Sequence, residues 1–124
     1  MLEFSNVRQD LGGFKRYFCD DTFDLFVWYD HPGGPITGFQ LVYDKGANAR
    51  AITWLRNKGF RHNKVEGDSS YYNQTPILVR DGVFDSRGIQ ELFRAHSQGV
   101  DEEIVALVTS IIGRYDPRLD DQSV

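Results

Sequence analysis

Cysteine and long hydrophobic runs are the two features that this chain has least of. Its 124 residues include one cysteine, Cys19, so neither an internal disulfide nor a zinc-finger spacing of cysteines is possible. No run reaches the roughly 18 apolar residues that a membrane-spanning helix requires. The N-terminal sequence, MLEFSNVRQD, lacks the basic region and apolar run of a signal peptide. We therefore expect a cytoplasmic protein without a membrane segment.

Basic residues are also too few and too scattered for a nucleic-acid-binding surface. The chain has 14 Lys and Arg residues against 18 Asp and Glu residues, and its net charge is −4. Binding to phosphates requires a clustered basic surface, which the sequence does not contain. The remaining composition is that of one globular domain. We expect this domain to span residues 1–117 and a disordered acidic tail to span residues 118–124.

The first half of the chain predicts an antiparallel β-meander. Segments rich in aromatic and β-branched residues alternate with turn-forming residues at intervals of roughly eight to twelve residues. The connection Asp44–Asn48 contains Asp, Gly and Asn, which favour a hairpin, and it lacks the glycine-rich run of a phosphate-binding loop. Five strands are predicted, namely Gly13–Cys19, Phe23–Asp30, Ile36–Tyr43, Arg50–Leu55 and Phe60–Glu66.

Helical periodicity is found only near the C-terminus. Asp85 or Ser86 can cap a helix over Arg87–Ser97, and Asp101 can cap a second helix that Pro117 ends. Strands first and helices last indicate an α+β fold. We expect an antiparallel β-meander of about five strands, followed by two C-terminal helices that pack on one face of the sheet.

The sheet face that the helices leave uncovered is the place to look for function. Alternation along the second predicted strand places Phe26 and Trp28 on the same face. Pairing Trp28 with Gly38 adds Gln40 and Val42 to this second face. Such a face is too aromatic for a plain solvated surface, and an exposed apolar patch indicates a ligand groove or a partner surface.

Two further residues are expected on the second face. If Arg56 pairs with Phe60 across the intervening turn, then Trp54 lies opposite His62. The long polar loop Gly67–Pro76 follows, and its Tyr72 could form a movable rim. The predicted ligand-binding residues are therefore Trp28, Gln40, Trp54, His62 and Tyr72. The structural alternative is that the loop, the N-terminal segment or a second copy of the chain covers this face.

Histidine is the most plausible residue for proton transfer, and His62 is the candidate. His31 lies in a turn that is rich in proline and glycine, where solvent exposure is expected. His96 lies on the apolar stripe of the first helix, where a hydrogen-bonded structural role is expected. A structural cross-strand role is the favoured interpretation of His62, so the catalytic residues, if there are any, stay unknown.

The sequence predicts no metal site and no cofactor. Asp20, Asp21 and Asp24 could offer carboxylate oxygens to a hard cation, but they lack the glycine and the terminal glutamate of a calcium loop. A turn rich in aspartate explains them as well. Cys19 lies beside two of these carboxylates, which disfavour a reactive thiolate.

Blocks along the chain resemble a family of short uncharacterised bacterial proteins. The resemblance implies a bacterial origin and no particular activity, ligand or cofactor. It extends over roughly residues 13 to 85. The blocks are FDLFVW (Phe23–Trp28), GFQLVYDK (Gly38–Lys45), AITW (Ala51–Trp54) and TPILV (Thr75–Val79).

Two functions are consistent with these observations. The first is a small cytoplasmic module that binds a partner or a small apolar ligand through the aromatic second face, and we expect it to be a homodimer. The second is a small enzyme that uses His62 as general acid or base in a cleft on the same face. A carboxylate within hydrogen-bond reach of His62 would favour the enzyme, and a self-complementary aromatic face would favour the module.

Overall fold

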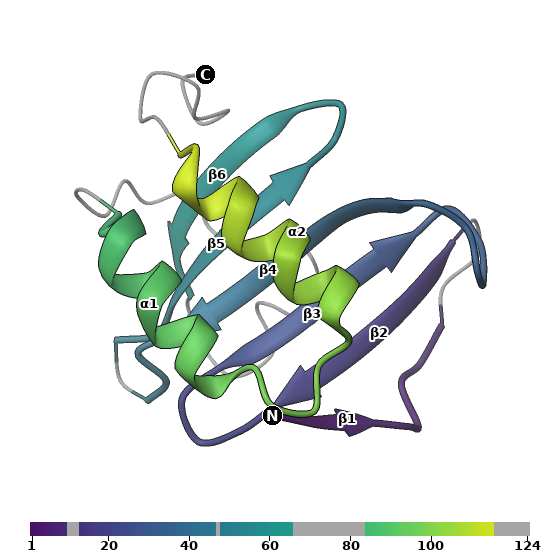
Figure 1. Cartoon of the computed structure of the whole chain (residues 1–124), viewed down its shortest axis with the longest axis horizontal. Helices are drawn as coiled ribbons and strands as arrows, with labels where there is room; N and C mark the ends of the chain where they lie inside the picture. The colour runs from purple at the N-terminus through teal and green to yellow at the C-terminus, as the bar shows by residue number, and fades with distance from the viewer. Residues whose placement is uncertain (10–12, 47, 66–83, 116–124) are drawn as a thin grey trace.

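The chain forms one six-stranded antiparallel sheet followed by two helices (Figure 1). The computed structural model describes residues 1–9, 13–46, 48–65 and 84–115. The strands lie side by side in chain order, so each pairs only with its neighbours in sequence. The elements are β1 (Leu2–Phe4), β2 (Phe14–Cys19), β3 (Asp24–Tyr29), β4 (Ile36–Tyr43), β5 (Arg50–Leu55), β6 (Gly59–Lys64), α1 (Ser86–His96) and α2 (Glu102–Gly113).

The α+β fold is confirmed, with six strands rather than about five. The additional strand, β1, has only three residues, which is too short to show an alternating pattern in the sequence. The predicted pairing of Trp28 with Gly38 is also confirmed. The predicted pairing of Arg56 with Phe60 is wrong, because the hairpin closes with Leu55 opposite Gly59.

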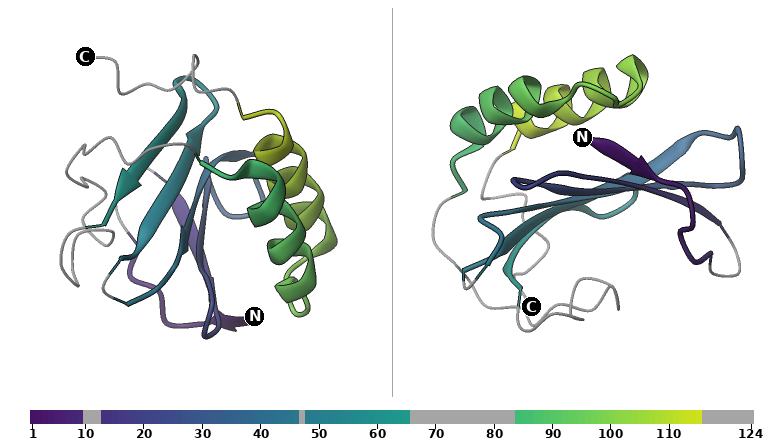
Figure 2. Two further views of the ribbon diagram at one scale, coloured as in Figure 1. Left: turned by 90° about the vertical axis from the view of Figure 1, so that its left-hand side faces the viewer. Right: turned by 90° about the horizontal axis from the view of Figure 1, so that it is seen from below.

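Both helices lie on the same side of the sheet (Figure 2). We call the sheet surface beneath them the helix face, and its strand residues include Phe18, Leu25, Phe39, Ile52 and Phe60. We call the opposite surface the rear face. Residues on the rear face alternate with those of the helix face along each strand. Leu25 and Val27 of β3 therefore lie on the helix face, together with Phe39 and Leu41 of β4.

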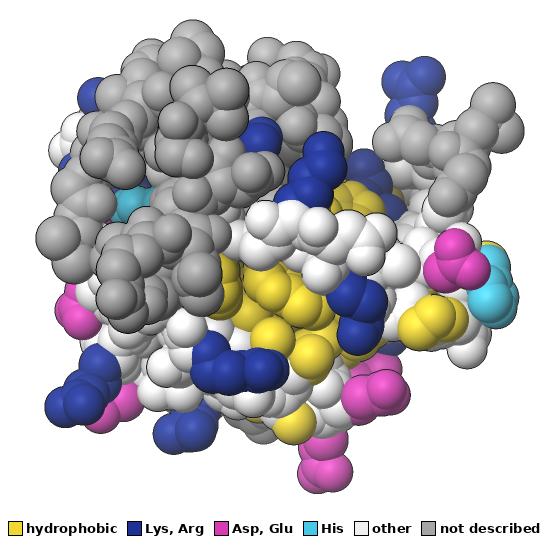
Figure 3. Space-filling model, turned by 90° about the horizontal axis from the view of Figure 1, so that it is seen from above, with side chains coloured by type: hydrophobic (Ala, Val, Ile, Leu, Met, Phe, Trp, Pro, Cys, Tyr) yellow, Lys and Arg dark blue, Asp and Glu magenta, His cyan; other side chains and the backbone are white. Residues whose placement is uncertain are grey.

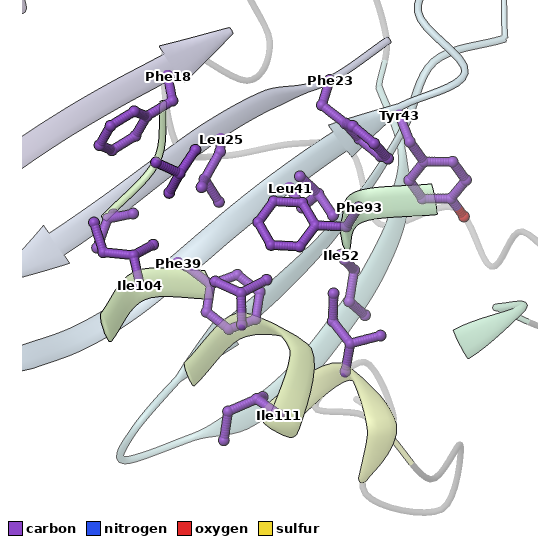
Figure 4. Close-up of a cluster of buried hydrophobic side chains, with 14 of the residues drawn as sticks. Phe18, Phe23, Leu25, Phe39, Leu41, Tyr43, Ile52, Phe93, Ile104 and Ile111 are labelled. Carbon is purple, nitrogen blue, oxygen red and sulfur yellow. The ribbon is translucent and has the colours of Figure 1, made fainter. Parts of the chain in front are cut away.

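The main hydrophobic core fills the space between the helix face and the two helices (Figure 4). Phe39 and Leu41 of β4 lie at its centre and are fully buried. Phe93 of α1 and Ile104 of α2 reach the same cluster from the helical layer. Burial of a large aliphatic or aromatic side chain contributes about 1.5–3 kcal/mol, so this cluster accounts for the way in which the helices are held on the sheet.

The start of each helix is set by an aspartate, although the two act differently. Asp85 caps α1 as predicted, and its carboxylate accepts a hydrogen bond from the backbone N–H of Gly88 at 3.1 Å. Asp101 occupies the cap position of α2, but its side chain makes no capping hydrogen bond. Its Oδ2 instead lies 2.8 Å from Nη1 of Arg16 on β2. The predicted side-chain cap by Asp101 is therefore wrong, and the carboxylate links helix to sheet.

Two polar links hold the helices against the sheet. Arg16 binds both Glu3 of β1 and Asp101, and hydrogen bonds to Arg16 hold the pKa of each carboxyl below its ordinary value. Nδ1 of His96, at the end of α1, lies 2.7 Å from Oδ2 of Asp20. Burial alone would raise the pKa of Asp20, but hydrogen bonds from the backbone of Phe23 and from His96 outweigh it and lower the pKa.

Candidate functional site

One row of side chains crosses the entire rear face. The strand register places Phe4 opposite Tyr17, then Phe26, Gln40, Thr53 and Arg61 in succession from β1 to β6. The row is aromatic over β1 to β3 and polar over β4 to β6. Neighbours in such a row have Cβ atoms about 4.5–5.5 Å apart, which is close enough for side-chain contact.

The aromatic half of the row is tightly stacked. The rings of Tyr17 and Phe26 are parallel, with centroids 4.6 Å apart. The ring of Phe4 meets Tyr17 edge-on at 5.8 Å. Oη of Tyr17 donates a hydrogen bond to Oδ1 of Asp24 at 2.8 Å, and burial together with this carboxylate raises the pKa of the phenol. Tyr17 therefore stays protonated and acts as a fixed donor.

The polar half of the rear face contains buried atoms that make no hydrogen bond. Asn63 is fully buried and Gln40 is 1 % exposed. In the part of the chain that the structure describes, no partner is found for Oε1 of Gln40, for Oγ1 of Thr53 or for either amide atom of Asn63. An unsatisfied buried polar group costs about 1–3 kcal/mol, so these three residues are unfavourable for stability alone. We call them the polar cluster.

Small apolar residues adjoin the polar cluster. Val42 and Ala51 lie in the same cross-strand row as Asn63, one row away from Gln40 and Thr53. They form a second hydrophobic cluster together with Ala49 and Val65. All four side chains are buried, so the polar cluster borders a small apolar core on the rear face.

Two of the predicted site residues, Trp54 and His62, lie on the other side of the sheet. Trp54 pairs with Phe39, which places it on the helix face, where its ring centroid lies 5.9 Å from that of Phe39. His62 pairs with Ile52 on the same face. The predicted face of Trp54 and His62 is therefore wrong, and so is their placement directly opposite each other. Gln40 and Trp28 do lie on the rear face, as predicted.

His62 lies within an aromatic cluster beneath the helices. It is 3 % exposed, and its Nε2 lies 2.5 Å from Oη of Tyr43. Its ring also lies parallel to that of Tyr43 and is in contact with Phe84. General acid or base catalysis requires a histidine within reach of the reacting group, and His62 lies on the helix face, on the opposite side of the sheet from Gln40 and Trp28.

The other histidines are placed as expected. The side chain of His31 is 63 % exposed, beside Asp30 in the turn after β3. His96 is half-buried, and its ring meets Phe23 edge-on in addition to its bond to Asp20. Tyr72, the remaining predicted site residue, lies outside the described residues, as do its loop Gly67–Pro76 and the predicted tail 118–124.

The aspartates at the start of β3 are engaged within the protein. Asp20 accepts hydrogen bonds from the backbone N–H groups of Thr22 and Phe23, which is the turn geometry that its sequence predicts. Asp24 is buried and binds Nζ of Lys45 at 3.1 Å. Among the described residues, no group of three or more His, Cys, Asp and Glu side chains is placed to hold a metal ion.

The connection Asp44–Asn48 is the hairpin between β4 and β5, as expected. Asp44 and Gly46 both have positive φ angles, 50° and 120°, which aspartate and glycine tolerate. Lys45 turns back toward the start of β3, where its Nζ also donates to the backbone carbonyl of Asp20 at 2.7 Å. The lysine thus ties the hairpin to the sheet and is not part of a phosphate site.

Hydrophobic surface is also present outside the polar cluster. Seen from above, hydrophobic side chains gather at the centre of the molecule, with Lys and Arg side chains around them (Figure 3). The strands β3 and β5 end on this side (Figure 1). Two large hydrophobic residues of β1 are also exposed, Leu2 by 80 % and Phe4 by 44 %.

Comparison of the chain with known protein families, with curated proteins and with solved structures found no match. The resemblance to short bacterial proteins therefore stays a prediction. In the ranges that the structure describes, no helix is long and apolar enough to cross a membrane.

Sequence reasoning missed Thr53 and Asn63, the two residues that join Gln40 in the polar cluster. The signal that could have identified them is the alternation within β5 and β6. Once Trp54 is assigned to the helix face, Thr53 must lie on the rear face, together with Arg61 and Asn63.

Proposed function

We propose that the protein is a small binding module whose ligand lies on the rear face and is held by Gln40, Thr53 and Asn63. The observation that carries this proposal is the set of buried polar atoms to which the described part of the chain offers no hydrogen-bond partner. Trp28, on the same face and partly exposed, supplies apolar contact area. The predicted small ligand and the predicted Gln40 and Trp28 are thus retained, whereas Trp54 and His62 are not.

The argument depends on the cost of burying unpaired polar groups. Such groups are rare in folded proteins because each of them gives up hydrogen bonds to water without replacement. A rear face built for stability alone would carry valine, leucine or isoleucine at these positions. Polar side chains that are kept at this cost are characteristic of binding sites, where the ligand supplies the missing partners.

The test is to replace polar side chains by apolar ones of similar shape. Asn63→Leu and Thr53→Val remove unsatisfied atoms, so each is expected to raise the free energy of unfolding by about 1 kcal/mol in the absence of ligand. Urea denaturation measures this change. The same variants are expected to lose any small molecule that copurifies with the parent protein, as detected by native mass spectrometry.

Gln90 offers a matched control, because its amide has a partner. Its Nε2 donates to the backbone carbonyl of Thr109 at 2.7 Å. Gln90→Leu is therefore expected to lower the free energy of unfolding by about 1 kcal/mol. If Asn63→Leu lowers stability as Gln90→Leu does, then Asn63 is satisfied within the fold and the proposal is wrong.

We also propose the compartment, the origin and the oligomeric state of the module. A bacterial cytoplasmic homodimer agrees with the single cysteine and with the exposed apolar side chains of Leu2 and Phe4 on the edge strand β1. The sequence places Phe26 on the face where a second copy of the chain could bind. Its side chain is only 2 % exposed, so it offers little surface to such a dimer. The alternative of an enzyme based on His62 has less support, because His62 lies on the helix face, whereas Gln40 and Trp28 lie on the rear face.

A further inference from the structure

The two edges of the sheet differ in how they are protected from a further strand. β1 and β6 are the outer strands, so each has one side that pairs with no strand among the described residues. An unpaired edge tends to pair with another chain, and proteins oppose this with charged side chains, especially lysine. β6 carries Arg61 and Lys64, whereas β1 carries Glu3 as its one charged residue. β1 is therefore the less protected edge.

Large apolar side chains are exposed on β1. Leu2 is 80 % exposed and Phe4 is 44 % exposed, and in the described chain only one other large hydrophobic residue, Leu92, is classed with them. Leu2 pairs with Cys19 and Phe4 pairs with Tyr17, so both lie on the rear face. Figure 1 shows β1 at the margin of the sheet, with no other helix or strand beyond it. Exposed apolar side chains that share one face of a free edge indicate contact with another chain.

The sequence of β1, Leu-Glu-Phe, has one large apolar residue on each side of Glu3. When two such strands pair in antiparallel fashion with Glu3 on a two-fold axis, Leu2 of each copy lies opposite Phe4 of the other. Side chains directly opposite each other have Cβ atoms about 4.5–5.5 Å apart, so the pairing makes two identical apolar contacts. The strand is thus complementary to a second copy of itself.

Arg16 reduces the one unfavourable feature of this pairing. Glu3 faces its own copy across the axis, and like charges directly opposite each other are destabilising. Arg16 holds the carboxylate in a two-point contact, with Nε 2.8 Å from Oε2 and Nη2 2.8 Å from Oε1. Because Arg16 also binds Asp101, part of the repulsion remains, and added salt should strengthen the pairing.

We propose that β1 pairs in antiparallel fashion with β1 of a second copy of the chain, with Glu3 on the two-fold axis, so that the two sheets join into one. This inference rests on the homodimer of the proposed function and adds its contact and its symmetry. The two rear faces then form one continuous surface. Two three-residue strands bury less than the roughly 1,200 Å² of a stable interface, so the dimer should form at high micromolar concentration.

Cysteine cross-linking tests both the contact and its register. Leu2→Cys and Phe4→Cys are made in a Cys19→Ser background, because Cys19 lies opposite Leu2 within the same chain. In a mixture of the two variants, the thiols at positions 2 and 4 face each other at a Cα separation of about 5 Å, which a disulfide can span. Within either variant alone, the two copies of the thiol are roughly 8 Å apart, which is too far for a disulfide.

Mild oxidation of the mixture is expected to give at least about tenfold more disulfide-linked dimer than either variant alone. Leu92→Cys on α1, in the same background, takes the place of Phe4→Cys in a control mixture, which should give no more dimer than the single variants. Equal yields in the test mixture and in the single variants would overturn the inference, because the contact would then lack the two-fold register.

The inference and the proposed function fail in distinguishable ways. If static light scattering shows a dimer that Leu2→Ser leaves intact, the homodimer stands and the β1 contact is wrong. If the parent protein is monomeric at all micromolar concentrations, the homodimer and the contact are both wrong. The stability of Asn63→Leu tests the polar cluster independently, because Asn63 on β6 lies at the opposite edge of the sheet from β1.

Discussion

The helix face and the rear face are built from the same strands, yet they differ in what they bury. On the helix face, Phe39 and Leu41 contact apolar side chains of α1 and α2, and the buried His62 has a hydrogen bond to Tyr43. On the rear face, Gln40 and Asn63 are buried just as deeply, but the described residues offer no hydrogen-bond partner to Oε1 of Gln40 or to the side-chain amide of Asn63. The first arrangement accounts for stability, whereas the second reduces it.

This difference shows why burial alone is a poor guide to function. Side chains of the two faces are similarly hidden from solvent, so exposure does not separate a core from a site. Hydrogen bonding distinguishes the faces better, because most of the buried side-chain atoms without a hydrogen-bond partner among the described residues lie on the rear face. The predictions below test whether the two faces differ in this way.

The largest effect is expected for Phe39→Ala on the helix face. Phe39 is fully buried at the centre of the core, so its removal creates a cavity and should cost about 3–5 kcal/mol of unfolding free energy. Leu92→Ala is the control, since Leu92 is 41 % exposed on α1 and should cost far less. Equal losses in the two variants, measured by urea denaturation, would show that the core has been misplaced.

The two tryptophans provide a matched pair across the sheet. Trp54 is partly buried and packs against the main core, with Arg56 above its ring, whereas Trp28 lies on the rear face. We expect Trp54→Ala to cost about 2–3 kcal/mol and Trp28→Ala to cost less. Trp28→Ala should instead weaken ligand binding. A larger stability loss for Trp28→Ala would contradict the division between the faces.

Acid is expected to weaken the helix face selectively. The pKa values of Glu3, Asp20 and Asp101 lie below their ordinary values in the folded chain. Such groups add stability above their unfolded pKa, and this stability is lost as the pH falls through the folded pKa. The melting temperature should therefore fall below about pH 4, and Asp20→Asn should make the fall less steep. A melting temperature that is independent of pH in this range would show that these links contribute nothing.

The smallest effect on stability is expected at the edge strand β1. Leu2 is 80 % exposed, so Leu2→Ser should change the unfolding free energy by no more than about 0.5 kcal/mol. If β1 is the homodimer contact, the same change should convert dimer to monomer in static light scattering. A parent protein that is monomeric at all micromolar concentrations would contradict the dimer.

Most of the fold could be predicted because its signals are local. β4 and β5 have the predicted boundaries, and Asp85 caps α1 as its position before an apolar stripe indicates. The pairing of Trp28 with Gly38 could also be deduced, since only that alignment collects the apolar residues of both strands on one face. β1 could not be predicted, because three residues carry no periodicity.

The site was harder to predict because it depends on the register of long hairpins. The connection between β4 and β5 places Arg50 opposite Tyr43, and this odd offset puts Trp54 beneath the helices. A shift of one residue would have moved it to the rear face. Between β5 and β6, Gly59 has a φ of 85° and already belongs to the strand, which the turn sequence alone does not reveal.

The nearest-neighbour order of the strands has a consequence for how the chain folds. Each strand from β2 onward pairs with the strand that directly precedes it in sequence. Contacts that are close in sequence have a low loop-closure entropy and speed folding, so the sheet should assemble hairpin by hairpin. The bond from Arg16 to Asp101 spans 85 residues and can form only when α2 docks. We therefore expect the helical layer to close over a sheet that is already paired, and to be the first part to detach on unfolding.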